Sequence, residues 1–262
     1  TRARVNDQRS GGGVLCDGFG RVQWVFTLNY KNRCERSKCT QSVIEMGPTT
    51  CHLLADRQAG MMIPTFEFED RLAANGYQCL AGVDEAGRGP LAGPVVAAAV
   101  VLSPDQVPQG LNDSKALTAR KREALLKLII EHADVGIGEA SVQEIDEINI
   151  LRASHLAMCR AIDALPKRPD HVLIDGNLIP KELTLPATAI VKGDSLSLSI
   201  AAASIVAKTR RDAIMRDLAQ QCPGYGWETN QGYPTKCHKE ALQNLGVTPH
   251  HRRSFKPVHN ML

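Results

Sequence analysis

The sequence has no long apolar run. No stretch approaches 18 uninterrupted apolar residues, so a transmembrane helix of ordinary length is excluded. The first residues also lack the basic segment followed by an apolar segment that marks a secretory signal, which favours a cytoplasmic protein without a membrane partner. The composition, 43% hydrophobic and 23% charged, is ordinary for a soluble globular protein, and 262 residues suffice for one large domain.

Paired cysteine motifs are lacking as well. Eight cysteines are scattered along the chain, and only Cys34 and Cys39 are near neighbours, with no matching second pair. This spacing suits neither a structural zinc site nor a disulfide framework in a chain of this length. We therefore expect free thiols.

The net charge of +3 conceals an uneven distribution. Residues 61–191 carry 12 Lys and Arg against 18 Asp and Glu, whereas residues 192–262 carry 10 against 5. An acidic part can bind cations while a basic part binds phosphates. This arrangement suits a metal-dependent enzyme that acts on a polyanion.

The chain is organised around residues 79–94, in which an apolar run ends at Asp84 and Glu85 and is followed by a glycine-rich turn and a second apolar run. This pattern predicts a strand over 79–85, a tight turn, and a second strand over 95–102. Neighbouring side chains of a strand point to opposite faces, so one of the two carboxylates must point toward a covered face. A divalent metal ion would offset the cost of burying it.

The remaining patterns predict an α/β fold with a mixed five-stranded sheet. Further strands are expected at 134–141, 171–175 and 188–191, with helices over 66–74, 118–132, 141–165 and 197–220, and a small helical part at the C-terminus. Asp175 ends one of these strands and Asp194 follows another. Because ligands of open α/β sheets bind beyond strand ends, we expect Asp84, Glu85, Asp175 and Asp194 to converge and bind metal, as in a two-metal phosphodiesterase.

Residues 1–62 differ from the rest in being rich in polar residues and glycine, without sustained apolar periodicity. We expect a largely disordered extension before a catalytic domain over 63–262. One hypothesis is that Met61 or Met62 is the natural start and that the reading frame is over-extended, because all recognisable patterning begins after Met62. Mass-spectrometric mapping of the mature N-terminus tests it.

Several sequence blocks together resemble the signature blocks of the ribonuclease HII family, most closely its bacterial members. The resemblance covers 63–262 in unbroken order and is carried by DEAGRGP at 84–90, LNDSK at 111–115, LIDGN at 173–177, KGD at 192–194, SIAAASIVAK at 199–208 and GYPT at 232–235. It implies a ribonuclease H-like fold and a Mg²⁺- or Mn²⁺-dependent endonuclease. The implied substrates are RNA–DNA hybrids and duplex DNA with embedded ribonucleotides, cut on the 5′ side of the ribonucleotide to leave 5′-phosphate and 3′-hydroxyl ends.

The resemblance also implies residue roles. The four acids match the metal-binding carboxylates of the family, and Gly87, Arg88, Gly89 and Tyr233 match its elements that sense the ribose 2′-hydroxyl. Glycine independently suits that role, since it lets the backbone approach a sugar closely. The remaining candidates for substrate contact are polar or basic residues, namely Asn112, Ser114, Lys115, Lys192, Lys208, Arg252 and Arg253. We expect a monomer.

Other classes fit less well. The glycines at 87–93 are spaced somewhat like a dinucleotide-binding fingerprint, but Pro94 and a strand follow where a helix would be required. A binding-only descendant of the fold would be expected to lose one of the four acids. A junction resolvase or transposase would not need the glycine–arginine–glycine block. The related ribonuclease HIII branch carries an extra N-terminal DNA-binding domain, which residues 1–60 do not resemble.

Overall fold

The structure is a computed structural model that describes residues 4–6, 12–16, 22–26 and 63–262. The chain divides into two compact units, residues 1–51 and residues 52–262. In the first unit, β1 (Arg4–Asn6), β2 (Gly12–Cys16) and β3 (Val22–Phe26) pair in antiparallel order. These short strands were not predicted from the sequence. Most of 1–62 lies outside the described residues, so its assignment as an extension stays a prediction.

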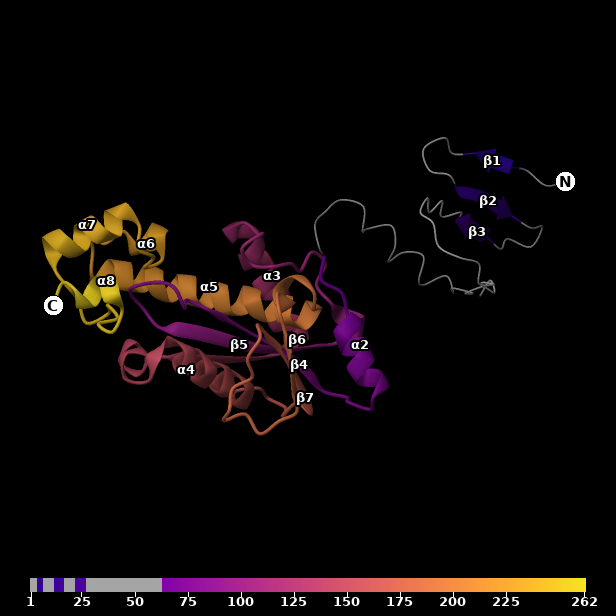
Figure 1. The fold of residues 1–262 in the computed structure, drawn as a ribbon, viewed down its shortest axis with the longest axis horizontal. Coiled ribbons are helices and arrows are strands. Elements are labelled where there is room, and N and C mark those ends of the chain that lie inside the picture. The colour runs from indigo at the N-terminus through magenta and orange to yellow at the C-terminus, as the bar shows by residue number, and fades with distance from the viewer. Residues whose placement is uncertain (1–3, 7–11, 17–21, 27–62) are drawn as a thin grey trace, which may run out of the picture. The chain divides into compact units, whose positions relative to one another are not determined.

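The second unit is built on the predicted mixed five-stranded sheet (Figure 1). Its strand order is β6-β5-β4-β7-β8, in which β4, β5 and β6 pair antiparallel while β4, β7 and β8 pair parallel. The strands are β4 (Leu80–Ala86), β5 (Val95–Leu102), β6 (Ala133–Ala140), β7 (His171–Asp175) and β8 (Ala187–Ile190). The central strand β4 therefore carries the organising segment.

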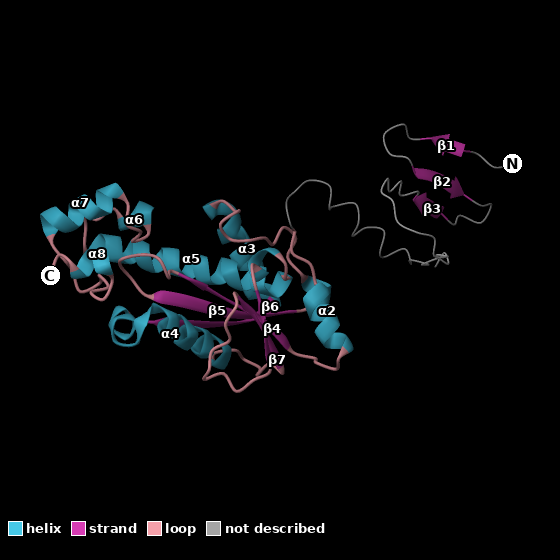
Figure 2. Cartoon of the chain, viewed as in Figure 1, coloured by secondary structure: helices cyan, strands magenta, loops and turns pink. Residues whose placement is uncertain are grey.

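Helices cover both faces of this sheet (Figure 2). One core joins Ala81 and Val83 of β4 to α4, and a second core joins alternate residues of β5 to α3 and α5. The helices are α2 (Glu67–Ala74), α3 (Ala119–His132), α4 (Val142–Asp163) and α5 (Leu198–Gln221). Since β4 alternates, Gly82 and Asp84 lie on the α5 side, whereas Glu85 shares its face with Ala81 and Val83.

Polar caps fix where the helices begin. The side chain of Thr118 accepts from the backbone N–H of Lys121, and Ser141 forms a capping box with Glu144. The predicted helix over 141–165 is broken at Asn149, which has a φ of 66°. Its side-chain oxygen accepts from the N–H groups of residues 151 and 152, so it caps a second helical segment inside α4.

The C-terminal part is helical, as predicted. It comprises α6 (Trp227–Asn230), α7 (Lys236–Leu245) and α8 (Lys256–His259), packed around the fully buried Trp227. The cysteines of the described segment 63–262 are free thiols, and no helix in the described residues is long and apolar enough to span a membrane.

Gly82 sets how closely β4 approaches α5. A methyl group at this position would lie 2.2 Å from the carbonyl carbon of Ser199. We predict that Gly82→Ala lowers the free energy of unfolding by about 3 kcal/mol or more, the upper end of the usual cost of overpacking. Urea denaturation measures it.

Gly76→Ala is the matched control, because its added methyl group meets no atom within 4 Å and only its φ of +96° opposes the substitution. We expect that strain to lower the free energy of unfolding by about 1 kcal/mol. Equal losses in the two variants would show that the contact between β4 and α5 does not limit stability.

Candidate metal centre and active site

Two of the predicted acids meet because their strands are parallel neighbours. Val83 of β4 is paired with Ile174 of β7, so the residues that follow them, Asp84 and Asp175, lie at the same edge of the sheet. Asp84 faces α5 and is 5% exposed, while Asp175 ends β7. The carboxyl ends of parallel strands thus deliver two carboxylates to one place.

The third acid arrives through a tight turn after β8. Lys192 adopts a left-handed conformation with a φ of 59°, and the 3₁₀ helix η3 (Gly193–Ser195) follows it. The backbone N–H of Gly193 donates to the Asp175 carboxylate at 2.7 Å, which ties the turn to β7. Asp194 is thereby carried to the pair formed by Asp84 and Asp175.

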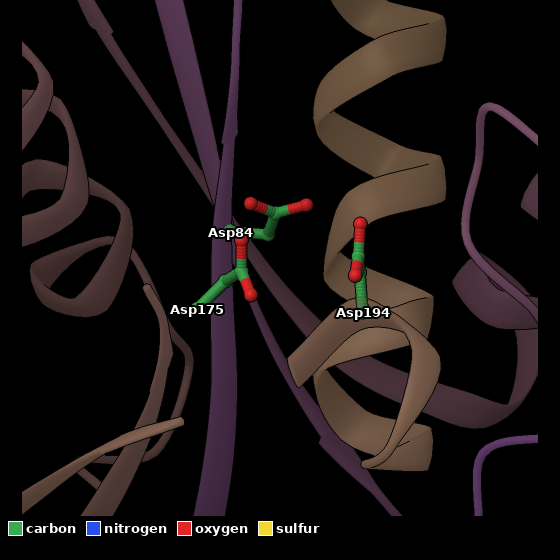
Figure 3. Close-up of side chains that lie close together, drawn as sticks. All are labelled: Asp84, Asp175 and Asp194. Atoms are coloured by element: carbon green, nitrogen blue, oxygen red, sulfur yellow. The ribbon is translucent and has the colours of Figure 1, made fainter. Parts of the chain in front are cut away.

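The three aspartates form one compact cluster (Figure 3). Each offers a carboxylate oxygen within 4.8 Å of the others. Asp84 and Asp194 are buried, with 5% and 6% of their surface exposed. Burial raises the pKa of Asp84 well above its ordinary value, and the negative charges of Glu85 and Asp175 raise it further. Burial and the charge of Asp194 likewise raise the pKa of Asp175. A bound cation would relieve this repulsion between the carboxylates.

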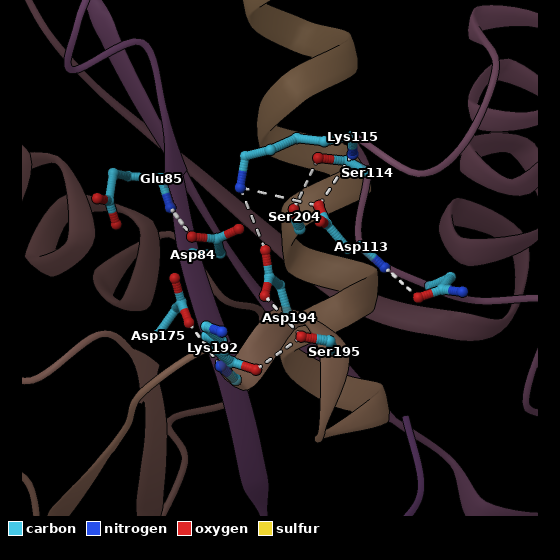
Figure 4. Close-up of polar contacts among 12 residues, drawn as sticks. Asp84, Glu85, Asp113, Ser114, Lys115, Asp175, Lys192, Asp194, Ser195 and Ser204 are labelled. Carbon is cyan, nitrogen blue, oxygen red and sulfur yellow. Dashed lines mark hydrogen bonds and ion pairs between the residues drawn. The ribbon is translucent and has the colours of Figure 1, made fainter. Parts of the chain in front are cut away.

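The donor set fits a hard divalent ion. Three carboxylates without thiolate or imidazole suit Mg²⁺ or Mn²⁺ rather than zinc or copper. Among the described residues, Lys115 approaches the cluster with an ammonium group, which lies 3.3 Å from an Asp194 oxygen (Figure 4). Its side chain is 76% exposed and can leave. The cluster would hold a divalent ion through Asp84, Asp175 and Asp194.

Glu85 does not join this cluster. Its carboxylate forms an ion pair with Arg88 at 3.2 Å, and in Figure 4 its side chain turns away from the three aspartates. The other oxygen, Oε2, is buried without a hydrogen-bond partner. Burial raises the pKa of Glu85, and the charge of Asp175 also contributes, so the group lies within the electrostatic range of the cluster. Its metal-binding role stays a prediction.

The glycine turn lies beside the predicted tyrosine. Gly87 has a φ of +101°, a conformation that glycine adopts without strain. A Cβ atom at Gly89 would lie 3.3 Å from Cε1 of the Tyr233 ring. Tyr233 is 45% exposed, so its ring and the exposed Gly89 border solvent together. The structure therefore places the two expected ribose-sensing elements next to each other.

Comparisons with known proteins agree with this geometry. Residues 81–258 match the family described as Ribonuclease HII. The chain is 67% identical over 203 residues to Ribonuclease HII of Ruegeria pomeroyi, covering 78% of this chain and 87% of that protein. It is 61% identical to Ribonuclease HII of Paracoccus denitrificans, covering 76% and 95%. The crystal structure of ribonuclease H2 from Pyrococcus horikoshii has a TM-score of 0.59 and 28% identity, covering 70% and 97%.

The chain belongs to the ribonuclease HII family. It has the ribonuclease H-like fold and is a ribonuclease H, an endoribonuclease that acts on RNA–DNA hybrids with divalent metal ions. The sequence predicted this family, fold and cofactor class, and all three are confirmed.

Four other predicted substrate contacts of this ribonuclease HII lie in different environments. Ser114 is buried and accepts a hydrogen bond from Ser204 at 2.8 Å. The side chain of Asn112 accepts from the N–H of Asp113, and Lys208 forms an ion pair with Asp212 at 2.6 Å. Only Lys192 is exposed beside the cluster without an ion pair in the described residues. Contacts of these groups with substrate stay predictions.

Arg252 was one of the candidates for substrate contact, and the structure does not support this role. Its side chain is fully buried, and its guanidinium donates to backbone carbonyls of the glycine turn. Arg211, which sequence reasoning missed, is 1% exposed and donates to the same segment. No sequence signal distinguishes a buried arginine from an exposed one in a basic stretch. Arg253 remains exposed.

Relief of repulsion predicts the effect of Asp84→Asn. We expect this variant to stabilise the metal-free protein by about 1–3 kcal/mol, within the range of most single substitutions. Because the pKa of Asp84 is raised on folding, the wild-type free energy of unfolding should fall as pH rises from about 3.8 through the raised value, and the gain from Asn should grow over the same interval.

Thermal melts in EDTA and in Mn²⁺ measure this. The wild type should remain folded in EDTA and melt at a higher temperature in Mn²⁺, because an ion that binds only the native state stabilises it. Asp84→Asn should lose most of the Mn²⁺ effect. If Mn²⁺ raised the melting temperature of Asp84→Asn as much as that of the wild type, Asp84 would not belong to the metal site.

Proposed function

We propose that residues 63–262 form the catalytic domain and that it both cleaves the RNA strand of hybrids and cuts duplex DNA on the 5′ side of a single embedded ribonucleotide. The products would carry 5′-phosphate and 3′-hydroxyl ends. The observation that supports this best is the convergence of three carboxylates within 4.8 Å at the end of the strand that leads into the glycine turn. We assign Asp84, Glu85, Asp175 and Asp194 as the metal-binding acids.

When bound, a pair of divalent ions supplies Lewis-acid chemistry, activating a water molecule and stabilising the leaving oxygen. The protein's part is to hold the carboxylates in place. The backbone of Glu85 donates to Asp84 at 2.7 Å and that of Gly193 donates to Asp175 at 2.7 Å, so one oxygen of each is fixed. We assign Lys115, whose exposed side chain lies at the cluster, as a contact to a phosphate of the substrate strand.

Selection of RNA over DNA requires a group within hydrogen-bond reach of the 2′-hydroxyl. We assign this reading to the backbone of Gly87–Gly89, with the Tyr233 ring packed on the neighbouring sugar. The turn begins two residues after Glu85, so the reading group shares one strand and its exit with two of the acids, Asp84 and Glu85. A Cβ atom at Gly89 would lie 3.3 Å from the Tyr233 ring, so the turn and the ring are close enough to contact the same nucleotide.

We further infer that the domain acts as a monomer and in the cytoplasm. All four assigned acids come from one chain, so the proposed chemistry needs no second copy. The relatives described above carry the name Ribonuclease HII, and the nucleic-acid substrate that this name implies supports the cytoplasmic assignment.

The deciding experiment uses the wild-type protein and a labelled DNA duplex that contains one ribonucleotide. We expect a single cut on the 5′ side of that ribonucleotide with Mg²⁺ or Mn²⁺, and none in EDTA or on an all-DNA duplex. Cleavage of an RNA–DNA hybrid without cleavage of this duplex would restrict the activity to hybrids.

Asp175→Asn tests the metal-binding assignment. We expect it to lower kcat by at least about a thousandfold, the scale of lost electrostatic stabilisation in an active site, while hybrid binding in a gel-shift assay stays within a few-fold. Near-normal turnover would remove Asp175 from the metal site.

Tyr233→Ala tests the sensor. We expect kcat/KM at a lone embedded ribonucleotide to fall by about ten- to a hundredfold, consistent with loss of a stacking contact worth about 1–3 kcal/mol. Tyr233→Phe is the matched control, since it keeps the ring and removes only the hydroxyl. Unchanged rates in Tyr233→Ala would disprove the sensor role.

A further inference from the structure

Two buried arginines lie beneath the glycine turn without a carboxylate partner. Arg211 of α5 is 1% exposed and Arg252 is fully buried. Within the described residues, neither has an acidic oxygen within 4.0 Å. A buried charge without a counter-charge is costly and is retained only where its donors are satisfied in another way.

Backbone carbonyls satisfy Arg252. Its Nε donates to the carbonyl oxygen of Gly93 at 2.9 Å and Nη1 donates to that of Arg88 at 3.1 Å. Nη2 donates to Gly87 at 2.6 Å and to Pro94 at 3.2 Å. One guanidinium therefore holds both ends of the turn, and its planar fork suits this better than a single ammonium would.

Arg211 binds the same segment from the α5 side. It donates to the carbonyl oxygens of Ala92 and Pro94 at 3.1 and 3.2 Å, and also to Gln231 at 3.1 Å. A Cβ atom at Gly87 would lie 2.0 Å from its Nε, so Gly87 is pressed directly onto the guanidinium. This contact explains why glycine is needed at position 87 beyond its positive φ.

Both sides of the proposed ribose reader depend on these bonds. Gln231 lies two residues before Tyr233, and the N–H of Leu91 donates to the carbonyl of Gly232 at 2.8 Å. The carbonyls of Gly87 and Arg88 are occupied by Arg252, whereas in 63–262 the N–H groups of Arg88 and Gly89 have no protein acceptor. The turn is thus held through its carbonyls and keeps N–H donors free for a ligand.

The two guanidiniums remain charged at neutral pH. Burial lowers the pKa of Arg211 to about 10, and burial together with the charge of Arg211 lowers that of Arg252 to about 9. Both values lie above 7, so the turn rests on two positive charges. Carbonyl dipoles that point toward the guanidiniums orient the opposite, N–H side of the peptides away from them.

We propose that Arg211 and Arg252 are positioning residues that fix the Gly87–Gly89 turn against the Tyr233 segment and thereby set the enzyme's ability to recognise a single ribose. This inference rests on the proposed reading of the 2′-hydroxyl by that turn. A lone ribonucleotide offers one 2′-hydroxyl, so a displaced turn misses it. A continuous RNA strand offers a 2′-hydroxyl in every register, so a displaced turn still finds one.

The test compares kcat/KM of Arg252→Lys on two substrates, duplex DNA with one embedded ribonucleotide and an all-RNA strand paired with DNA. Lysine keeps the charge and loses the fork. We expect the single-ribonucleotide value to fall by about a hundredfold, as for a displacement of about 1 Å in an active site, and the hybrid value to fall at least tenfold less.

Arg216→Lys is the matched control, because Arg216 lies on α5, the helix that carries Arg211, and its side chain is 50% exposed. This control variant should leave kcat/KM unchanged on both substrates. Millimolar guanidinium should partly restore single-ribonucleotide cleavage to Arg252→Ala, since the ion can occupy the vacated site.

A second variant covers the case in which Arg252→Lys does not fold. The carboxylate of Asp146 accepts from the backbone N–H groups of Arg253 and Ser254, so Asp146→Asn loosens the segment that carries Arg252 without opening a cavity. It should shift the substrate ratio in the same direction by several-fold. Equal losses on both substrates, or no loss, would overturn the positioning role. Failure of the wild type to cut the single-ribonucleotide duplex would instead defeat the proposed function.

Discussion

Mutual repulsion among buried carboxylates is the constraint on which this structure depends. Asp84, Asp175 and Asp194 hold like charges within 4.8 Å, in a place where burial alone already opposes ionisation. Such a cluster would spread apart unless each backbone segment were fixed independently. The strand pairing of β4 with β7 fixes the first two acids, and the bond from Gly193 to Asp175 fixes the third. Divalent metal ions, which the family uses, would offset the repulsion among these carboxylates.

The third acid depends on a segment that precedes the region matched by the family. Glu69 of α2 is 5% exposed and accepts from the hydroxyl of Ser197 at 2.6 Å and from the N–H of Ser199 at 3.0 Å. Thr65 also exchanges backbone hydrogen bonds with Leu196 and Leu198. These bonds hold the junction between η3 and α5 directly after Asp194. The segment from residue 65 to the end of α2 therefore packs in the same compact unit as the three aspartates, while a catalytic domain that begins at residue 63 stays a prediction.

The sequence was informative where chemistry and periodicity coincide. Apolar runs that end in an acid predicted the positions of Asp84 and Asp175, since strand ends and buried carboxylates obey local rules. The sequence was uninformative where contacts between distant segments determine the conformation or burial of a residue. Asn149 interrupts α4 because its own side chain caps a second helical segment. The apolar period of the sequence continues through this position and therefore predicts one unbroken helix. Arg252 is buried only because four carbonyls of a turn more than 150 residues earlier in the chain surround it, and no local pattern announces that.

Catalysis and ribose recognition share a single strand exit. Asp84 and Gly87 are three residues apart, so at most about 10 Å of extended chain separates a metal-binding acid from the reading turn. Gly82 presses the same strand onto α5, and Gly87 presses its exit onto Arg211, a residue of that same helix. Movement of β4 relative to α5 would therefore displace Asp84 and the reader together. A nuclease that must cut only beside a ribose gains from this short connection, because it holds the acid at a constant distance from the sugar that the turn reads.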